Sequence, residues 1–403
     1  MLALNPSMRN IILFDDESRE QMLPLSYTRP VAEIRTGIFT IRERWERLLK
    51  GKASYITSEY LADRYPMHIE DDNIVINGAL MPNDRLVRLM EQMEPNEALM
   101  DQGNLIAARL NSKQFEHLLH EESIEEISGI ELVDTPFIHL AYPWDLFLFL
   151  RATIEYDFDL ITHGRTSQSI PSNNQVISPD AIFLEEGAHV TCSILNAQSG
   201  PIYIGKNAQV MEGSVIRGPV TIGEGSIVKM GSKIYGPTAI GPDCRVGGEL
   251  KEVVMLGHSN KAHDGFLGNS IIGEWCNLGA GTTVSNLKNN YSNVRMWDHT
   301  TQSMRDTGLQ FLGMVMGDHS KAGIQSMFNT GTMVGVACNI FGEGFPPKFI
   351  PSFSWGGASG LVPHRIEEAM ETATRVMARR DITFGETDEK IFRNVFNLSA
   401  VYR

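Results

Sequence analysis

The chain has 403 residues, of which 42% are hydrophobic and 21% are charged, a composition typical of a globular protein with two or three domains. Its formal charge of −14 argues against a general nucleic-acid binder, although a local basic patch could still hold a small anionic ligand. No window has the ~18 apolar residues of a membrane span and no signal-peptide pattern is present, so we expect a cytoplasmic protein without nucleic-acid or membrane contacts.

Short apolar runs alternate with amphipathic runs over the stretch 1–140. The pattern predicts strands at 10–14, 73–77 and 104–108, and helices at 37–50, 84–93 and 113–120. Such alternation predicts an open α/β sheet, in which ligands bind at the carboxyl ends of the strands. The loops after Phe14 and Asn77 are therefore the expected places for a site.

Residues Ile11 to Trp45, with Leu23-Pro-Leu-Ser-Tyr-Thr-Arg-Pro30 among them, resemble the opening of a sugar-1-phosphate nucleotidyltransferase. That family has a strand, then a Gly-x-Gly-Thr-Arg loop whose backbone N–H groups approach the nucleotide phosphates, then a Leu-Pro segment. Here the loop reads Asp16-Glu17-Ser18-Arg19, so the arginine is kept and acidic residues replace the glycines.

The Mg²⁺ site of that family is altered as well. The family has an aspartate after an Asn-Gly strand end, whereas this chain reads Asn77-Gly78-Ala79, and alanine cannot bind a metal. One interpretation is an active nucleotidyltransferase that holds Mg²⁺ with other carboxylates, the candidates being Asp15, Asp16 and Asp84.

The other interpretation is a degenerate domain that binds a sugar phosphate or only supports the assembly. Losing both the loop and the metal ligand favours it, because phosphoryl transfer depends on positioning and metal electrostatics. Arg19, Arg29 and Arg35 could grip a phosphate bidentately, or form surface ion pairs with neighbouring carboxylates.

A strict period of six runs from Ile204 to Val246. The aliphatic residues at this spacing are Ile204, Val210, Ile216, Ile222, Val228, Ile234, Ile240 and Val246. Neither a helix nor an alternating strand gives such a period. It is typical of a parallel β-helix, in which each repeat is a short strand and a turn. The register is broken between Gly247 and Ile272, is absent from 285–310, and returns from Met316 to Ile340.

These patterns divide the chain into an α/β domain (1–140), a helical connector (141–175), a hexapeptide-repeat β-helix (176–350) and a C-terminal helical cap (351–403) that covers the open end of the solenoid. In the connector, residues Trp144 to Ile161 have apolar and aromatic side chains at helical spacing and are expected to dock one domain on the other. The four cysteines, Cys192, Cys244, Cys276 and Cys338, have neither metal-ligand nor redox spacing. We expect them to be buried packing residues in a reducing compartment.

The segment from Lys251 to Asn286 resembles the left-handed β-helix acyltransferases. The best match is the acetyltransferase half of the bifunctional glucosamine-1-phosphate acetyltransferase/N-acetylglucosamine-1-phosphate uridyltransferase family. The motifs that carry it are Asn260-Lys261-Ala262-His263, Phe266-Leu267-Gly268-Asn269 and the run from Ile272 to Thr282. The resemblance implies a left-handed β-helix, acetyl-CoA as co-substrate and a homotrimer with acyl sites between chains.

The resemblance also assigns site residues. His263 corresponds to the family's catalytic histidine, and Lys251 to a lysine that contacts the sugar phosphate. Asn277 and Asn286 correspond to asparagines that bind the amino sugar. The turn Gly279-Ala280-Gly281 corresponds to the acetyl-CoA contact, through its alanine.

The chemistry can be stated from the residues alone. A neutral amine that attacks a thioester must lose a proton, and histidine, with a pKa near ~6.5, is suited to accept it at neutral pH. The tetrahedral intermediate needs an N–H donor, which the glycine-rich turn at 278–281 can offer. The alternative for His263 is an ordinary surface turn.

Acceptor recognition departs from the family. Phe266 and Leu287 replace two tyrosines, so another amino sugar or a nucleotide sugar is a possible acceptor. Further candidates are Lys288, Arg295 and Arg305 in the loop 285–306, and the turn 317–321, which we expect to be exposed. Three functions therefore remain: an N-acyltransferase acting on an amino sugar phosphate or nucleotide sugar, a nucleotidyltransferase forming a UDP- or dTDP-sugar, and a non-catalytic sugar-nucleotide-binding scaffold.

Overall fold

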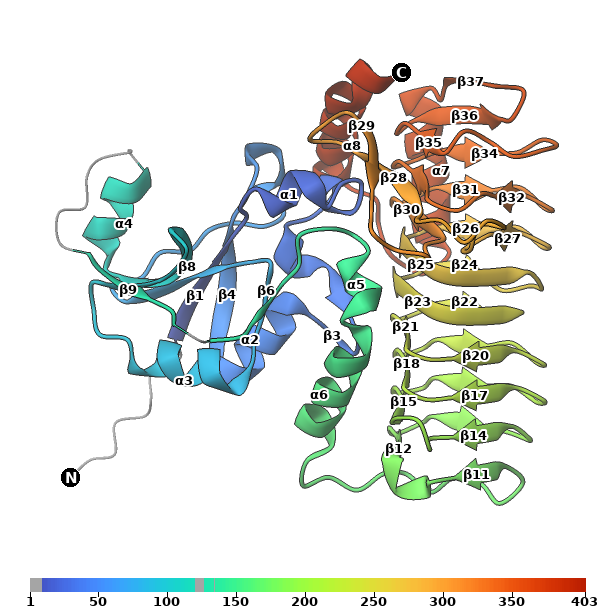
Figure 1. The fold of residues 1–403 in the computed structure, drawn as a ribbon, viewed down its shortest axis with the longest axis horizontal. Coiled ribbons are helices and arrows are strands. Elements are labelled where there is room, and N and C mark those ends of the chain that lie inside the picture. Colours follow the sequence, from blue (N-terminus) through green and yellow to red (C-terminus); the bar gives the residue numbers. More distant parts are fainter. Residues whose placement is uncertain (1–8, 120–126, 134) are drawn as a thin grey trace. The chain divides into compact units, whose positions relative to one another are not determined.

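The computed structural model describes residues 9–119, 127–133 and 135–403. Its contacts divide the chain into two compact units (Figure 1). The first holds the residues up to 19, with 29–34 and 39–141, and the second holds 20–28, 35–38 and 142–403. The segments 20–28 and 35–38 therefore belong to the second unit, although the residues before and after them in the sequence belong to the first.

The first unit is built on a mixed six-stranded sheet in the order β4-β1-β5-β8-β7-β9. Its strands are β1 (Arg9–Phe14), β4 (Gly51–Ile56), β5 (Asn73–Asn77), β7 (Glu97–Asp101), β8 (Asn104–Leu110) and β9 (Ser128–Glu131). β1 runs parallel to β4 and β5, whereas β8 is antiparallel to β5 and β7. The expected α/β sheet is confirmed, and the ends of β1 and β5 meet at one edge as the sequence predicted.

Local capping sets where the helices of this unit begin. Thr40 and Glu43 form a reciprocal capping box, so α2 (Ile41–Leu49) begins after Thr40 rather than at the predicted Gly37. Asn83 accepts hydrogen bonds from Arg85 N and Leu86 N and caps α3 (Asp84–Gln92). The other helix of the unit is α4 (Ser112–Leu119).

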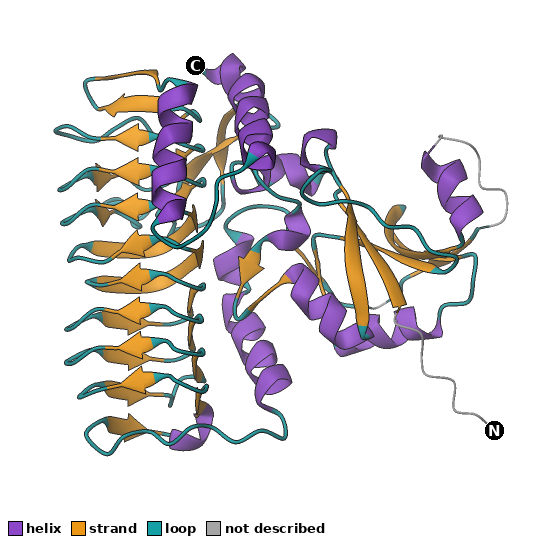
Figure 2. Ribbon diagram, turned by 180° about the vertical axis from the view of Figure 1, so that it is seen from behind, coloured by secondary structure: helices purple, strands orange, loops and turns teal. Residues whose placement is uncertain are grey.

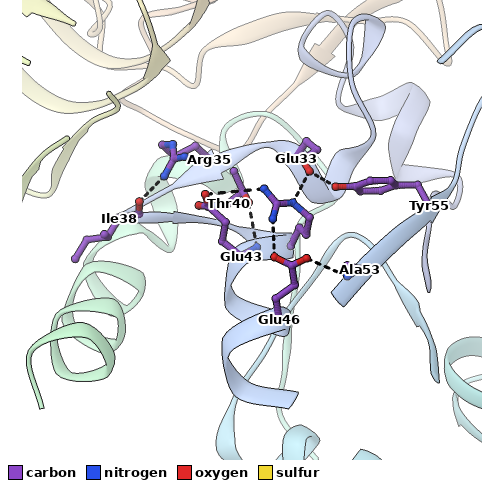
Figure 3. Close-up of polar contacts among 9 residues, drawn as sticks. Glu33, Arg35, Ile38, Thr40, Glu43, Glu46, Ala53 and Tyr55 are labelled. Carbon is purple, nitrogen blue, oxygen red and sulfur yellow. Dashed lines mark hydrogen bonds and ion pairs between the residues drawn. The ribbon is translucent and has the colours of Figure 1, made fainter. Parts of the chain in front are cut away.

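A charged network joins α2 to the sheet (Figure 3). Arg42 donates from Nε to Glu33 Oε1 and from Nη1 to Glu46 Oε2, both at 2.6 Å. The Tyr55 hydroxyl also donates to Glu33, and Ala53 N donates to Glu46 Oε1 at 2.9 Å. Burial and the charge of Glu33 raise the pKa of Tyr55, so this hydroxyl remains a donor.

The second unit begins with two helices, α5 (Asp145–Leu148) and α6 (Leu150–Thr162). The helical spacing predicted over 144–161 corresponds to these two helices, which are separated where Phe149 leaves the helical conformation, with φ −91° and ψ 1°. Asp157 on α6 is fully buried, and its Oδ2 accepts a hydrogen bond from Ile38 N at 2.8 Å.

The rest of the second unit is a stack of parallel coils with three faces (Figures 1 and 2). The first face begins with β11 (Gln175–Ile177), β14 (Ile194–Asn196), β17 (Val215–Arg217) and β20 (Lys233–Tyr235). The second begins with β12 (Ile182–Leu184), β15 (Ile202–Ile204), β18 (Val220–Ile222) and β21 (Thr238–Ile240). The third includes β13 (His189–Val190), β16 (Gln209–Val210), β19 (Ile227–Val228), β22 (Arg245–Val246), β24 (Asn260–Lys261), β26 (Asn277–Leu278), β31 (Lys321–Ala322) and β34 (Asn339–Ile340).

The period of six follows from this geometry. Ile202 pairs with Val220 and Val220 with Thr238, so each coil is three hexapeptides long and supplies one repeat to each face. The aliphatic residues spaced by six from Ile204 to Val246 are all 0–1% exposed and form the core. Coils of three hexapeptides are those of the left-handed β-helix, and the predicted fold is confirmed.

The register fails after Val246 because the coils change length. Arg245 pairs with Asn260 and Asn260 with Asn277, and both steps along the chain are shorter than three hexapeptides. Here the nine-residue strands β23 (Glu249–Gly257) and β25 (Phe266–Glu274) run across two faces without a break. Asn277 next pairs with Lys321, a much longer step, so one coil carries the repeat-free insertion.

That insertion contains an antiparallel hairpin, β28 (Arg295–Asp298) and β29 (Ser303–Asp306). The strand β27 (Thr283–Val284) precedes the insertion, and after it the coils continue through β30 (Met314–Met316), β32 (Met327–Phe328), β33 (Thr332–Val334) and β35 (Phe349–Ile350). A second hairpin, β36 (Ser354–Gly357) and β37 (Gly360–Pro363), follows at the last coil. Helices α7 (Ile366–Ala378) and α8 (Glu386–Leu398) come last, and α7 buries Ala369, Met370, Ala373 and Met377.

The remaining short elements are α1 (Ser18–Gln21), β2 (Arg35–Thr36), β3 (Phe39–Thr40), β6 (Leu80–Met81) and β10 (Ile138–His139). None of the helices in the described residues is both long and apolar enough to cross a bilayer. Three of the four cysteines are buried, but the expectation is wrong for Cys192, which is exposed on an early coil.

Candidate functional site

Two carboxylates follow β1 at the edge where β1, β4 and β5 end. Asp15 accepts hydrogen bonds from Val31 N at 2.8 Å, Thr57 Oγ1 at 2.6 Å and Arg19 Nη1 at 3.2 Å. Burial raises the pKa of Asp15, while Arg19 and these hydrogen bonds lower it, and the effect of burial is the larger. This carboxylate fixes the turn between β1 and the Val31 segment.

Asp16 faces a different set of donors. Its oxygens accept hydrogen bonds from Ser18 N at 2.9 Å and Asn77 Nδ2 at 2.6 Å, and His139 Nε2 lies 3.0 Å away. Burial alone would raise the pKa of Asp16, but the hydrogen bonds from His139, Ser18 and Asn77 outweigh it and lower this pKa. The loops predicted after Phe14 and Asn77 therefore do meet here.

Sequence reasoning missed His139 altogether. It is brought to Asp16 by β10, whose antiparallel pairing with β6 sets His139 opposite Leu80. A strand as short as β10 leaves no periodicity in the sequence, so no local signal could have found this histidine.

The predicted phosphate-binding arginines contact the protein itself. Arg19 donates to Ser58 Oγ and Tyr60 OH at 2.8 Å and to the carbonyl of Arg29 at 3.1 Å, besides its bond to Asp15. Arg29 is only 5% exposed. Arg35, in the second unit, donates to the carbonyl of Ile38. Arg19 therefore holds together segments at the edge of the first unit's sheet, whereas Arg35 makes a local contact within the second unit.

The carboxylates of this edge do not fit a Mg²⁺ site. The oxygens of Asp15 and Asp16 are taken up by protein donors, and Asp84 lies apart at the start of α3. Ala79 offers no side-chain oxygen, and its N–H donates to Asn77 Oδ1 at 2.9 Å. Among the described residues no group of three His, Cys, Asp or Glu side chains is placed to hold a metal.

In the β-helix, polar side chains form a column where the coils shorten. Asn269 donates to the carboxylate of Glu252, and Asn286 Nδ2 donates to Asn269 Oδ1 at 2.7 Å. Each coil contributes one of these three side chains, and the strand register sets Glu252 opposite Asn269. Lys251 begins the column, with its ammonium 3.8 Å from Glu252 and 5.3 Å from the centre of the Phe311 ring.

Phe266 belongs to the same cluster. A Cβ added at Gly268 would lie 2.5 Å from the Phe266 ring and 2.8 Å from Asn286 Nδ2, so this glycine makes room for both side chains. The structure therefore brings together Lys251, Asn286 and Phe266, the position where the family has tyrosine. We call Lys251, Glu252, Phe266, Asn269 and Asn286 the polar column.

His263 lies on an exposed turn between β24 and β25. Within the described part of the chain its imidazole has no hydrogen-bond partner. The pairing of Asn260 with Asn277 brings the 278–281 turn to the same corner one coil further on, and Gly281 N donates to Asp264 O at 3.0 Å. Adjacent coils lie about 4.8 Å apart, so His263 and Ala280 are near neighbours.

The N–H groups of this corner are not equivalent. Gly279 N donates to Ala322 O at 2.9 Å and Gly281 N to Asp264 O, so both hold neighbouring coils together. The Ala280 N–H has no acceptor among the described residues. Of the three predicted residues, Ala280 is thus the one with a donor left for a ligand.

Lys261 holds the His263 turn from inside. Its side chain is fully buried, and its ammonium donates to the carbonyls of His263, Asp264 and Gly247. Burial lowers the pKa of Lys261 to about 8. The lysine therefore has a structural role beneath the turn that presents His263.

Asn277 is separated from the polar column. It lies on the third face, where its Oδ1 accepts a hydrogen bond from Asn260 Nδ2 at 3.4 Å, and it lines a cavity of about 670 Å³ beside α7. Asn286 follows β27 in the next part of the coil. The two asparagines that the resemblance groups as one amino-sugar site lie on different faces here.

The expectation that the turn at 317–321 is exposed is wrong. Asp318 is 3% exposed and accepts hydrogen bonds from Thr28 Oγ1 at 2.6 Å and Glu274 N at 2.8 Å. The cationic side chains predicted in the loop 285–306 have partners in that same loop. Arg305 pairs with Asp298, and Lys288 donates a hydrogen bond to the Asn293 carbonyl.

Known protein families match both units. Residues 11–166 match the family described as sugar nucleotidyl transferase, and residues 201–235 match the bacterial transferase hexapeptide family of six repeats. The chain joins a sugar nucleotidyltransferase domain to a hexapeptide-repeat domain. Both are domains of transferases.

Two relatives with local sequence similarity are named as bifunctional proteins. The chain is 32% identical over 136 residues to the bifunctional protein GlmU of Methanocaldococcus jannaschii, covering 34% of this chain and 28% of that protein. It is 30% identical over 93 residues to a bifunctional sugar-1-phosphate nucleotidylyltransferase/acetyltransferase of Sulfurisphaera tokodaii, covering 23% of each. The matched part thus spans about a quarter of the length of these relatives.

Solved structures resemble the chain only distantly. The polySia-specific acetyltransferase NeuO is 11% identical, covers 52% of this chain and 94% of its own, and has a TM-score of 0.28. The acetyltransferase domain of PglB from Neisseria gonorrhoeae, solved with acetyl coenzyme A, is 12% identical, covers 88% and 99%, and has a TM-score of 0.16.

The two candidate regions relate differently to the matched families. The carboxylate edge around Asp15 and Asp16 lies within the sugar nucleotidyltransferase domain. The polar column and His263 lie beyond the matched repeats at 201–235, in coils that are shorter than three hexapeptides.

Proposed function

We propose that the protein is an acetyl-CoA-dependent N-acyltransferase that acts on an amino sugar phosphate or a nucleotide sugar. The observation that carries the proposal is the corner that joins His263 to the Gly279-Ala280-Gly281 turn. It combines an exposed imidazole with an N–H donor one coil away, in a hexapeptide-repeat domain. The relative named as a bifunctional sugar-1-phosphate nucleotidylyltransferase/acetyltransferase supports the same reaction class.

In the proposed reaction, the amine of the acceptor attacks the thioester carbonyl of acetyl-CoA. His263 accepts the amine proton as the C–N bond forms, and the Ala280 N–H donates to the oxygen that becomes negative. Collapse of the tetrahedral intermediate breaks the C–S bond and releases CoA as a thiol, which takes up the proton. Gly279 and Gly281 let the next coil pack closely at this corner, because a Cβ at Gly279 would lie 2.6 Å from the Gly323 backbone and one at Gly281 would lie 2.6 Å from the Gln325 side chain.

The polar column is the proposed acceptor site. Lys251 supplies a positive charge for a phosphate, and Asn286 supplies an amide that can hydrogen-bond to a sugar. Phe266, in place of the family's tyrosine, offers a ring face without a hydroxyl. Asn277 lies on another face. It would contact the acceptor only if the acceptor were long enough to reach past His263 onto that face.

A second candidate function is sugar-1-phosphate nucleotidyl transfer by the N-terminal domain, forming a UDP- or dTDP-sugar. The family match over residues 11–166 favours it, whereas the engaged carboxylates of Asp15 and Asp16 speak against a Mg²⁺-dependent mechanism. Arg19 and Arg29 would have to leave their present partners to hold a phosphate. A non-catalytic sugar-nucleotide-binding scaffold is the third candidate.

We further propose a cytoplasmic homotrimer with acyl sites between chains, as the hexapeptide-repeat domain suggests. A light-scattering mass three times that of the chain is the expected result. A monomer with full acyltransferase activity would contradict an acyl site between chains.

The central experiment screens amino sugars and sugar-1-phosphates for release of free thiol from acetyl-CoA. His263→Ala is expected to lower kcat by about 10²–10⁴-fold, the usual contribution of a general base, with unchanged circular dichroism. His189→Ala, an exposed histidine on β13, is the matched control. A wild-type rate in His263→Ala would remove the assignment.

A parallel assay measures pyrophosphate released from UTP or dTTP and a sugar-1-phosphate in the presence of Mg²⁺. Signal in this assay alone would support the second candidate. Binding of nucleotide sugars without turnover in either assay would identify the scaffold.

A further inference from the structure

Four cationic side chains surround one cavity of the second unit. The cavity has a volume of about 670 Å³ and is lined by Arg245, Lys321, Arg379 and Arg380, with Asn260 and Asn277 between them. This volume is in the range of small-molecule pockets, ~300–1,000 Å³. The cavity is lined by residues of the third face of the β-helix and by residues in and just after the C-terminal part of α7, and its lining includes neither His263 nor any residue of the polar column.

One wall is a straight row on the β-helix. Arg245 pairs with Asn260, Asn260 with Asn277, and Asn277 with Lys321, so four successive strands each contribute one outward side chain. With strands about 4.8 Å apart, the row extends roughly 14 Å. The neighbouring residues Val246 and Leu278 point into the core. Because successive side chains on a strand point to opposite sides, the residues of the row point outward.

The cations of this cavity are bonded mainly to neutral groups. Arg245 Nη1 donates to the carbonyls of Gly225 and Cys244, both at 3.0 Å, and Lys321 donates to those of Trp275 and His319 at 2.5 and 3.0 Å. Arg380 donates to Asn260 Oδ1 at 3.4 Å. None of these bonds neutralises a positive charge.

Acidic groups are scarce around the cavity. No carboxylate is among the described residues that line it, although the chain as a whole has a formal charge of −14. Two carboxylates outside the lining act on these cations. The half-exposed Asp243 lies 3.5 Å from His258 Nδ1 and 4.0 Å from Arg380 Nη1, and the charge of Asp318 partly offsets the lowering of the pKa of Lys321 by burial. Burial, and then the charge of Arg380, lower the pKa of Arg245 by more than the charge of Asp243 raises it, so Arg380 lies close enough to Arg245 for the two cations to repel each other.

We propose that this cavity is a binding site for a small phosphorylated molecule, with the phosphate or pyrophosphate group held between Arg245 and Lys321 on the β-helix and Arg379 and Arg380 directly after α7. Guanidinium groups bind phosphate oxygens in pairs, and an anion here offsets the repulsion among the four cations. The amides of Asn260 and Asn277 then face the uncharged part of the ligand.

The other role for the two arginines after α7 is to cap the helix. Arg379 is the C-cap residue of α7, and cations near a helix C-terminus interact favourably with its carbonyls. The two roles predict different effects when the arginines are replaced. Capping arginines contribute to stability without any ligand, whereas ligand-binding arginines contribute to affinity.

The test is calorimetric titration of the full-length protein with inorganic pyrophosphate at low ionic strength. We expect saturable binding that weakens as salt is added, and a Kd raised roughly tenfold or more by the Arg379→Ala/Arg380→Gln double variant. Arg375→Ala, on α7 and paired with Glu371 at the surface, is the matched control and is expected to leave the Kd unchanged.

A second variant keeps the test independent of helix stability. Asn260→Asp places a carboxylate beside Arg380 without changing side-chain size, so it is expected to fold and to compete with the anion for the arginines. Tighter or unchanged pyrophosphate binding in this variant would contradict the proposal. So would an absence of binding by the wild-type protein at millimolar pyrophosphate, or an equal Kd in the double variant.

Discussion

His299 gives the sharpest test of the electrostatics of the second unit. It follows β28, is 8% exposed, and contacts the rings of Tyr27, Phe349 and Tyr402 edge to face, at centroid distances of 6.1, 5.6 and 5.4 Å. Its Nδ1 has no hydrogen-bond partner in the described residues. Burial lowers the pKa of His299 to about 4, by more than the charge of Asp298 raises it.

This pKa makes stability depend on pH in one direction. In the unfolded chain the imidazole binds a proton near pH 6.5, but in the folded protein only near pH 4. Between these values the unfolded state binds more protons, so stability falls as the pH drops. A difference of about 2.5 in pKa corresponds to roughly 3 kcal/mol, all of it lost once the pH is below 4.

The measurement compares urea unfolding of the wild type and His299→Phe at several pH values from 7 to 4. The other titrating groups are common to both proteins, so the difference between them isolates His299. We expect the free energy of unfolding of His299→Phe to rise relative to that of the wild type as the pH falls. The larger ring can add only a difference that does not depend on pH. His189→Gln, at an exposed position, is the control. A difference that stays constant over this range would refute the reasoning.

Two further predictions concern packing and reactivity. Arg42→Met leaves Glu33 and Glu46 without their shared cation and is expected to destabilise the first unit by about 2–3 kcal/mol in urea unfolding. Arg88→Met, at an exposed position on α3, is the control, and equal unfolding midpoints of the two variants would contradict a stabilising network. Among the cysteines, a thiol reagent such as dithiobis-nitrobenzoate is expected to label only Cys192 in the native protein at neutral pH. Burial shields the other three and raises their pKa, to about 12 for Cys244 and Cys276 and about 11 for Cys338. Labelling of a second thiol without unfolding would show that the coils open.

Much of the fold is encoded locally. A coil of three equal faces places one inward residue every six, so the run from Ile204 to Val246 specifies both the strands and the core. Likewise, Asn83 is an N-cap because its short side chain reaches the amides of the first turn. The edge formed by the ends of β1 and β5 also follows from the sequence, since parallel neighbours end on the same side.

The residues around the candidate sites depend on contacts that the sequence does not show. His139 reaches Asp16 through the short pairing of β10 with β6, and the polar column joins Glu252, Asn269 and Asn286 at a spacing of 17. That spacing is not a multiple of six, because these coils have shortened turns. Periodicity carries no information at the positions where the solenoid departs from its own repeat.

The sequence by itself therefore determined the β-helix, its inward residues, the α/β sheet and the segment in which His263 lies, because each depends on repeated or neighbouring residues. Only the tertiary structure decided that Ala280 keeps an unused N–H, that Asn277 and Asn286 lie on different faces, and that Arg380 approaches Arg245. These outcomes depend on coil length and on where α7 packs, which are set by contacts between residues far apart in the chain.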